Sequence, residues 1–482
     1  MTDPSPRKAR VRGTHSTRDI KPESLKPLPK ALGVRDWPNP DNGHGAGDGF
    51  GGSDFPDREE PTRPDVPHPT PPPFQAPVER QEAMVDQRPT VHVIGLHHTI
   101  PSEGFSHCAF TGKVLRFPLV LHEAGYRVIE YANGPSESKA DEHITIWDYP
   151  QLEKFAGPDL FERTTSGLDG DSELQDLFGL LVQRELRKRV LPGDIIAHVF
   201  GCTSAAQRMV KAFPDAIHVE TGIGYGSGPF GAYRIFESES WRAWHMGHYT
   251  LANNGGGGTW PNYPELTTTQ VVPNYYDPSA FPLGDGGGCV DGSAIRHKPY
   301  ALWVGRLASI KGCEVVNKLA KCKPELTFKC VSGEPMNDEF RKRLLEGAPN
   351  VEFLGRVSSR AELAKLYGGA LCTIMPSMFW EPFGGVAVES LMCGTPVLCP
   401  DYAAFVETVR GYNDGVRCNT PEDYLEGLRA IRGDGRLSSE GRPERRARAI
   451  ERYGIEAVGL QYKAALGAIR RWHKRGLRPE GA

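Results

Sequence analysis

Residues 378–400 read MFWEPFGGVAVESLMCGTPVLCP, and this stretch indicates the fold. Its middle part, GVAVESLMCG, is predicted to be a helix that its last glycine closes. The segment TPVLCP that follows is short and apolar, which favours a buried strand. A helix that leads directly into such a strand is typical of a parallel α/β sheet.

The alternation of strands and helices continues on both sides of this stretch. Residues 89–132 read as strand, loop, helix and strand, and a second series of such units begins at residue 298. Residues 282–298 (PLGDGGGCVDGSAIRHK) are polar and rich in glycine, as a linker would be. The sequence therefore predicts an α/β protein with two doubly wound, Rossmann-like domains that face each other across a cleft. The predicted parts are an arm at 1–88, a first domain at 89–283, a linker at 284–297, a second domain at 298–455, and a terminal helix that crosses back, with a tail, at 456–482.

The length and charge of the chain set broad limits. A chain of 482 residues is too long for one hydrophobic core, since single cores stop growing near about 250 residues. The 57 basic and 60 acidic residues nearly cancel, so the whole-chain charge neither favours nor excludes a polyanionic partner. Residues 1–88 are rich in proline and glycine and are expected to be disordered. Residues 1–30 carry eight Lys or Arg against three acids, which fits either a phosphate-screening arm or a solvated tail.

The cysteines and the hydropathy indicate a reducing, cytoplasmic setting. None of the ten cysteines forms a Cys-x-x-Cys pair, and several lie in apolar runs where a free thiol packs as a small hydrophobic group. The N-terminus has no apolar stretch of the signal-peptide kind, and no run approaches the roughly 18 apolar residues of a membrane span.

Two glutamates in the opening stretch, Glu381 and Glu389, have seven residues between them. If the helix begins at the glycines, the amides of Gly384 and Gly385 lie at its first turn and favour an anion such as a phosphate. Glu389 then lies inside the helix, where it can accept two hydroxyls of a ribose, and Glu381 can reach a different hydroxylated ring. A nucleotide-sugar has these parts. The alternative is that both glutamates face solvent.

This stretch resembles the Glu-x7-Glu motif of retaining glycosyltransferases of family 4, which have the GT-B fold. The resemblance covers roughly residues 90–470. The segment VGRLASIKG is similar to a signature of that family and implies that Arg306 and Lys311 are the cations on the donor diphosphate. The Pro-Phe-Gly-Gly turn and the segment FLGRV add donor-binding residues by the same resemblance, namely Phe383, Gly384 and Gly385 in the turn, and Arg356 and Val357 next to the base.

The first domain is expected to hold the acceptor. The resemblance implies a glycine loop at Gly104, with simple loop flexibility as the alternative, and a strand that ends at His198, with a packed core histidine as the alternative. Family members often place a histidine on the donor sugar at the end of the next strand. Here that strand reads AIHVETGIGYG, so Glu220 takes the place of the histidine and His218 lies two residues earlier. Either side chain could serve.

The segments HVETGIGYG and YRIFESESWRAW resemble a subgroup of family 4 found in phages and bacteria. Some phage glycosyltransferases modify hydroxymethylated pyrimidines in DNA, which would place the protein in the host cytoplasm and give the basic arm a purpose. The expected partners are therefore a UDP- or GDP-sugar donor and an acceptor that is a glycan, a small molecule or modified DNA.

The expected chemistry is retaining transfer of a hexose or pentose without a metal or other cofactor. No carboxylate with a paired acid at a recognisable spacing suggests a covalent intermediate, and no Asp-x-Asp follows a strand of the fold region. Lesser alternatives are a nucleotide-sugar epimerase, a phosphorylase and a non-catalytic protein that binds sugar nucleotides or DNA.

Overall fold

The computed structural model describes residues 86–105, 108–156, 172–200, 203–223, 233–253, 268–286, 298–334, 336–357, 359–433, 437 and 440–477. The predicted arm at 1–88 lies outside these ranges apart from its last three residues. Most of the predicted linker at 284–297 also lies outside them.

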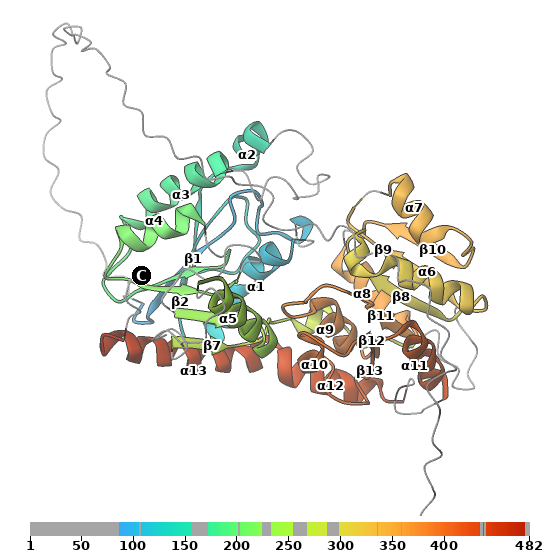
Figure 1. Ribbon diagram of the computed structural model, residues 1–482. Coiled ribbons are helices and arrows are strands. Elements are labelled where there is room, and N and C mark those ends of the chain that lie inside the picture. The colour runs from blue at the N-terminus through green and yellow to red at the C-terminus, as the bar shows by residue number, and fades with distance from the viewer. Residues whose placement is uncertain are drawn as a thin grey trace, which may run out of the picture. The chain divides into compact units, whose positions relative to one another are not determined.

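The first sheet has seven parallel strands in the order β3-β2-β1-β4-β5-β6-β7 (Figure 1). The strands are β1 (Thr90–Ile94), β2 (Arg127–Ala132), β3 (Glu142–Thr145), β4 (Ile195–His198), β5 (Ile217–Glu220), β6 (Tyr233–Phe236) and β7 (Thr269–Val271). The helices described between them are α1 (Ala109–Glu123), α2 (Tyr149–Ala156), α3 (Ser172–Leu186), α4 (Ser204–Ala212) and α5 (Glu239–Asn253).

The second sheet has six parallel strands in the order β10-β9-β8-β11-β12-β13. The strands are β8 (Tyr300–Val304), β9 (Thr327–Val331), β10 (Val351–Gly355), β11 (Cys372–Ile374), β12 (Val397–Pro400) and β13 (Gly415–Cys418). Its helices are α6 (Cys313–Cys322), α7 (Asp338–Leu345), α8 (Arg360–Gly369), α9 (Gly385–Met392), α10 (Phe405–Thr408), α11 (Pro421–Gly433) and α12 (Arg442–Tyr453), and α13 (Ile455–Lys474) follows. The predicted α/β class with two doubly wound parallel sheets is confirmed.

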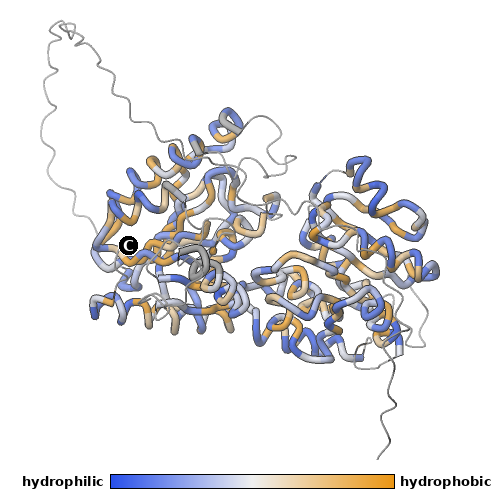
Figure 2. Tube along the Cα trace, in the orientation of Figure 1, coloured by the Kyte–Doolittle hydropathy of each residue, from blue (hydrophilic) through white to orange (hydrophobic). Residues whose placement is uncertain are grey.

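Apolar helix faces cover both sides of each sheet. In the first sheet, α1 contributes Phe117 to one core and α3 contributes Phe178 to the core on the opposite face. In the second sheet, α9 contributes Val388 to one core and α6 contributes Val316 to the other. Figure 2 shows the strands as hydrophobic stretches and the helices as alternating hydrophobic and hydrophilic turns. This is the pattern that amphipathic helices on a buried sheet require.

The topology of each sheet has one switch point, where successive strands begin to add on the other side. It lies between β1 and β4 in the first sheet and between β8 and β11 in the second. Ligands of such sheets bind beyond the carboxyl ends of the strands at this point. The loops after β8 and β11 carry Arg306, Lys311 and Glu381, so the fold brings these three predicted site residues to the switch point of the second sheet.

The helix α1 begins earlier than the sequence predicts. In the sequence, helical spacing begins with the segment KVLRFPLVLHEAG at Lys113 and the residues before it read as a loop, whereas the observed helix starts at Ala109. Thr111 is buried in the first turn of the observed helix, and its hydroxyl lies 2.7 Å from that of Thr99. Gly112 N donates to Cys108 O at 2.9 Å, which is a regular helical hydrogen bond to the N-cap residue. The tertiary contact of Thr111 offsets the weak helix propensity of Thr and Gly.

The helix α13 packs on the first sheet although it follows the second sheet in the chain. Val458, Tyr462 and Ile469 belong to the same core as Phe117 of α1. The rings of Tyr462 and Phe117 lie 5.1 Å apart in an edge-to-face arrangement. Figure 1 shows α13 in red on the α1 side of this sheet. The first core is therefore completed by residues from the end of the described chain.

We call the residues up to β7 the first half of the chain and those from β8 to α12 the second half. Two buried arginines of α12 hold loops of the second half together. Arg442 donates from Nη2 to Thr395 Oγ1 at 2.6 Å and to Gly368 O at 2.5 Å. Arg445 donates from Nη1 to Gly394 O at 2.5 Å. Both guanidinium groups therefore donate to acceptors of loops that lie far from α12 in the sequence.

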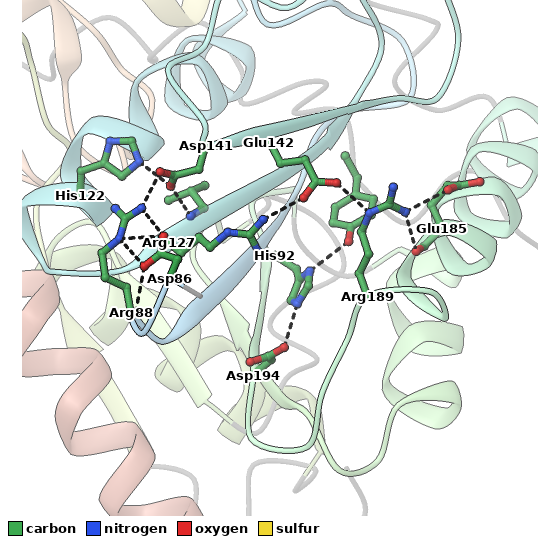
Figure 3. Close-up of polar contacts among 12 residues, drawn as sticks. Asp86, Arg88, His92, His122, Arg127, Asp141, Glu142, Glu185, Arg189 and Asp194 are labelled. Atoms are coloured by element: carbon green, nitrogen blue, oxygen red, sulfur yellow. Dashed lines mark hydrogen bonds and ion pairs between the residues drawn. The ribbon is translucent and has the colours of Figure 1, made fainter. Parts of the chain in front are cut away.

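A polar network joins the first three strands at their amino ends (Figure 3). Arg88 contacts the carboxylates of Asp86 and Asp141 at 2.6 Å each. Asp141 Oδ2 also lies 2.9 Å from His122 Nε2 and accepts from Val128 N at 2.7 Å. Burial opposes the charged form of Asp141, but the hydrogen bonds from Arg88, Val128 and His122 outweigh it and lower the pKa of this carboxyl.

The same network continues along the sheet edge. Figure 3 shows His92 between Tyr131 Oη, at 3.0 Å, and Asp194 Oδ2, at 3.1 Å. Arg189 joins Glu142 at the start of β3 to Glu185 of α3. This network lies at the end of the sheet opposite to the carboxyl ends of the strands, so it stabilises the fold and lies away from the switch point.

We expect the Asp141→Asn variant to lose about 1 to 2 kcal/mol of unfolding free energy at pH 7, because charged hydrogen bonds contribute about this much. A carboxyl with a lowered pKa in the folded state stabilises above its unfolded pKa and loses that effect as pH falls through its folded pKa. The gap between variant and wild type should therefore close below about pH 4. Urea unfolding at pH 7, 5 and 3 measures it, with the exposed Asp215→Asn as control. A gap that stays constant with pH would contradict this role of Asp141.

The described cysteines are free thiols. Six of them are buried, Cys108 is half-buried and Cys322 is exposed. Cys202 and Cys289 lie outside the described residues. No described helix is both long and apolar enough to cross a membrane.

Candidate functional site

The amino end of α9 forms the centre of the candidate site. Its N-cap is Gly384, which has a φ of 76° and therefore the left-handed conformation that favours glycine. The helix begins at Gly385, as the sequence predicts, and is eight residues long. The amides of its first turn lack acceptors within the helix and carry the positive end of its dipole. This end of α9 can therefore bind an anionic group.

Glu381 and Lys311 form an ion pair next to this helix end. Their side chains are 13% and 17% exposed. Ser377 donates to Glu381 Oε1 at 3.0 Å, and Lys311 Nζ lies 4.8 Å from the centre of the Phe379 ring. Trp303 Nε1 donates to the backbone oxygen of Lys311 at 3.1 Å and fixes the turn that carries it. Glu381 is thus mostly buried, and its carboxylate is held by the Lys311 cation and the Ser377 hydroxyl.

Arg306 lies on the loop after β8 and is exposed. Within the described ranges, it forms no ion pair with an acidic residue. The loop itself is fixed, because Leu307 N donates to Glu334 Oε2 at 2.7 Å. Arg306 is therefore a cation on an anchored loop, five positions before Lys311 in the sequence.

Glu389 is half-buried on α9 and does not face open solvent. Its Oε2 accepts from the hydroxyl of Tyr367 at 2.9 Å. Burial raises the pKa of Glu389, while Arg360, the Tyr367 hydroxyl and Arg116 act in the opposite direction. Both glutamates are thus positioned by neighbours from other elements.

We expect the Tyr367→Phe variant to bind a nucleoside diphosphate about 5-fold more weakly, because one hydrogen bond of about 1 kcal/mol no longer orients Glu389. Titration calorimetry with UDP and GDP measures the affinity. Tyr424→Phe is the matched control, since its buried hydroxyl donates to Met375 O of the same half. Equal affinities of Tyr367→Phe and wild type would exclude this role of the hydroxyl.

Three further predicted donor-side residues lie near the first half or in the second core. Arg356 follows β10 and donates from Nη2 to Gly104 O at 3.1 Å, which joins the two predicted residues directly. Val357 is half-buried and packs on the core to which Phe383 belongs. Phe383 is buried and stacks on Tyr276 with ring centres 6.3 Å apart.

Three predicted residues of the first half, His198, His218 and Glu220, lie on β4 and β5. His198 Nε2 lies 3.1 Å from His218 Nδ1, and His218 Nε2 lies 2.9 Å from Phe213 O. Burial lowers the pKa of His218 to about 4 and that of His198 well below its ordinary value, so both rings are neutral at pH 7. Glu220 is fully buried as the last residue of β5 and pairs in register with His198. The two histidines bind each other, and Glu220 ends its strand at the carboxyl edge.

The first half also contains a buried ion pair that was not predicted from the sequence. Lys113 of α1 lies 2.9 Å from Glu237 Oε1, and their side chains are 7% and 6% exposed. Glu237 follows β6 at the carboxyl edge of the sheet. The sequence indicated such a pair only through a lysine on the apolar face of a predicted helix, because a buried lysine requires an acidic partner. No group of three His, Cys, Asp or Glu side chains in the described ranges is arranged to hold a metal ion.

Residues 292–452 match the family Glycosyl transferases group 1. This segment, about a third of the chain, is therefore similar to a glycosyltransferase group 1 domain. It contains the donor-side residues discussed above for the second half, from Arg306 to Glu389, whereas the first half lies outside the match.

Curated proteins similar to this chain include a GDP-mannose-dependent alpha-(1-6)-phosphatidylinositol dimannoside mannosyltransferase of Mycobacterium tuberculosis. It is 32% identical over 135 residues, which is 28% of this chain and 33% of that protein. Glycogen synthase of the same species is 31% identical over 196 residues, or 39% of this chain and 44% of that protein. The chain thus spans about a third of the length of the first of these relatives.

Solved structures with a similar fold extend beyond the group 1 domain. Sucrose-phosphate synthase from Thermosynechococcus elongatus matches with a TM-score of 0.58 at 18% identity, over 81% of this chain and 100% of that one. The Anabaena protein Alr3699/HepE, solved in complex with UDP and glucose, matches with a TM-score of 0.53 at 16% identity, over 79% and 100%. The predicted GT-B fold is confirmed.

Proposed function

We propose that this protein is a retaining glycosyltransferase of the family 4 kind, which moves a sugar from a UDP- or GDP-sugar to an acceptor hydroxyl. One observation carries the proposal: the Lys311–Glu381 pair, the amino end of α9 and the half-buried Glu389 lie around the switch point of the second sheet. The printed names of the curated relatives, a mannosyltransferase that depends on GDP-mannose and a glycogen synthase, support glycosyl transfer.

Each part of the donor has its own proposed contacts. The amides of Gly384 and Gly385, together with Arg306 and Lys311, bind the diphosphate, because all are positive or donate hydrogen bonds. Glu389 accepts the ribose hydroxyls, and Glu381 accepts hydroxyls of the transferred sugar. Arg356, Val357 and Phe383 lie on the base side.

Retention of configuration follows from attack on the face that the leaving group departs from. The bond between the anomeric carbon and the phosphate oxygen breaks, and the acceptor oxygen forms its bond on the same face. The proton of the acceptor hydroxyl passes to the departing phosphate oxygen, so atoms and charge balance. Negative charge develops on the diphosphate, where fixed cations and helix amides lower the barrier.

The first half is proposed to bind the acceptor. Gly104 lies at the loop after β1, next to Arg356, and Glu220 ends β5 at the carboxyl edge. His198 Nε2 is in contact with His218 Nδ1, and His218 Nε2 with Phe213 O. We therefore assign the sugar-facing role to Glu220 ahead of the two histidines. The acceptor is a glycan or small molecule; a hydroxymethylated pyrimidine in DNA is the alternative that the resemblance to phage sequences raised.

The test incubates the full chain with UDP- and GDP-sugars and follows the released nucleotide with and without acceptors. Carbohydrate acceptors are compared with duplex DNA that contains 5-hydroxymethylcytosine or 5-hydroxymethyluracil, and products are identified by mass spectrometry. A DNA acceptor should make binding fall steeply between about 50 and 200 mM salt, whereas a neutral glycan should not. Conversion of the donor without any acceptor would indicate an epimerase. Binding of the donor with no turnover on any acceptor would indicate a non-catalytic protein.

A further inference from the structure

Arg116 of α1 points from the first half toward the residues around Glu389. Its Cζ lies 5.4 Å from the centre of the Tyr276 ring. Tyr276 belongs to the segment between β7 and β8. The charges of Glu389 and Arg360 both act on Arg116. This cation therefore belongs to the same group of side chains as the proposed ribose contact.

Two donor atoms of the Arg116 guanidinium have no partner among the described residues. Its Nε and Nη1 atoms are buried, and neither donates a hydrogen bond within this part of the chain. An unpaired donor in such a place costs about 1 to 3 kcal/mol, and more when the group is charged. Burial also lowers the pKa of Arg116. The two buried donor atoms of Arg116 are therefore available to bind the acceptor atoms of a ligand.

The acidic groups nearby already have partners. Glu389 accepts from Tyr367 at 2.9 Å. Glu103 accepts from Arg360 Nε at 2.8 Å, and Arg360 lies over the ring of Phe281. The remaining donors of Arg116 thus require an acceptor that the described protein does not supply.

The amino end of α9 closes this group on another side. A Cβ atom at Gly385 would lie 2.5 Å from the hydroxyl of Tyr276, the tyrosine under Arg116. Gly385 is the first residue of the helix whose amides are the proposed diphosphate contacts. Arg116, Tyr276 and this helix end are therefore neighbours, with Glu389 one turn further along the helix.

We propose that Arg116 is a further donor-binding residue, which donates from Nε and Nη1 to the phosphate next to the ribose of the nucleotide. The ligand class is a nucleoside monophosphate or diphosphate, free or as part of the sugar donor. The ribose-linked phosphate is chosen because Glu389, the proposed ribose contact, belongs to the same group. This inference rests on the proposed function, since it assigns a contact within the same donor site.

The test measures the affinity of the full chain for uridine, UMP and UDP, and for guanosine, GMP and GDP, by titration calorimetry. The variants are Arg116→Met, which keeps the stem on Tyr276, and Arg116→Lys, which keeps a charge. Arg187→Met, an exposed arginine of the first half, is the matched control. We expect Arg116→Met to bind the monophosphate and the diphosphate about 10- to 30-fold more weakly, with nucleoside binding unchanged, and Arg116→Lys to lie between it and wild type.

Thermal unfolding of the ligand-free variants separates binding from a structural role. Removal of a buried cation that lacks an acceptor should leave the unfolding temperature unchanged or raise it. A lower unfolding temperature with unchanged nucleotide affinity would overturn the inference and make Arg116 a packing residue. Loss of affinity for the diphosphate alone would overturn the assignment to the ribose-linked phosphate. If the wild type binds none of these nucleotides, the proposed function itself fails.

Discussion

We expect Arg306→Ala to lower the turnover of the nucleotide-sugar donor by on the order of 100-fold while the unfolding temperature stays the same. The cation is exposed on a loop that Glu334 anchors, so its removal leaves no buried charge behind. The proposed contact with the diphosphate strengthens as negative charge develops on the leaving group. The loss should therefore appear mainly in kcat.

Lys311→Ala should cause a similar loss of turnover for the same reason, but with a second effect. Lys311 also pairs with Glu381, whose side chain is only 13% exposed. Removing the lysine leaves this carboxylate without its cation and should lower the unfolding temperature. Lys318→Ala, an exposed lysine of α6, controls for the loss of a positive charge. Wild-type turnover in the Arg306→Ala, Lys311→Ala double variant would refute the assignment of both cations.

The second large effect is expected for Glu389→Gln, which should weaken binding of the donor by about 1.5 to 3 kcal/mol, or about 10- to 150-fold. An amide offers one acceptor oxygen and presents its own donors to the ribose hydroxyls, whereas a carboxylate accepts both. Calorimetry with UDP and GDP measures the loss. The exposed Glu362→Gln on α8 is the matched control.

Because the pKa of Glu389 is raised, a loss of donor binding in Glu389→Gln can be distinguished from a loss of stability. A carboxyl whose pKa is raised by burial destabilises the folded state above that pKa, where it must be charged. The neutral glutamine should therefore not lower the unfolding free energy at pH 7. Donor binding by the wild type should weaken as pH falls and Glu389 takes up a proton, and the variant should show no such step. Unchanged donor affinity in folded Glu389→Gln would remove the ribose contact.

The local pattern of the chain was enough to predict the strands and helices that position the second-half site. The helix that begins at Gly385 and the strand β12 follow from apolar spacing and from glycines at both helix ends, which are properties of ten to twenty consecutive residues. The order of the strands then brings Lys311 and Glu381 to one switch point, as a doubly wound sheet requires.

Side-chain partners far apart in the sequence could not be predicted in this way. Lys113 and Glu237 are separated by 124 positions, and nothing in either segment specifies the other. The segment RPERRARAIERY of α12 has the composition of an exposed basic helix, yet Arg442 and Arg445 are buried and bind carbonyls of distant loops. Arg116 likewise lies on a helix whose spacing indicates only which face is apolar. Its role depends on the segment that carries Tyr276.

The position of α13 has a consequence for the order in which the chain folds during synthesis. Val458, Tyr462 and Ile469 fill the core beside Phe117, but the ribosome adds them more than 300 positions later. Until then the strands and α1 can form while one apolar face of the first sheet stays open to water or to chaperones. The two halves are therefore expected to become native together, because the last described helix closes the core that the earliest strands began.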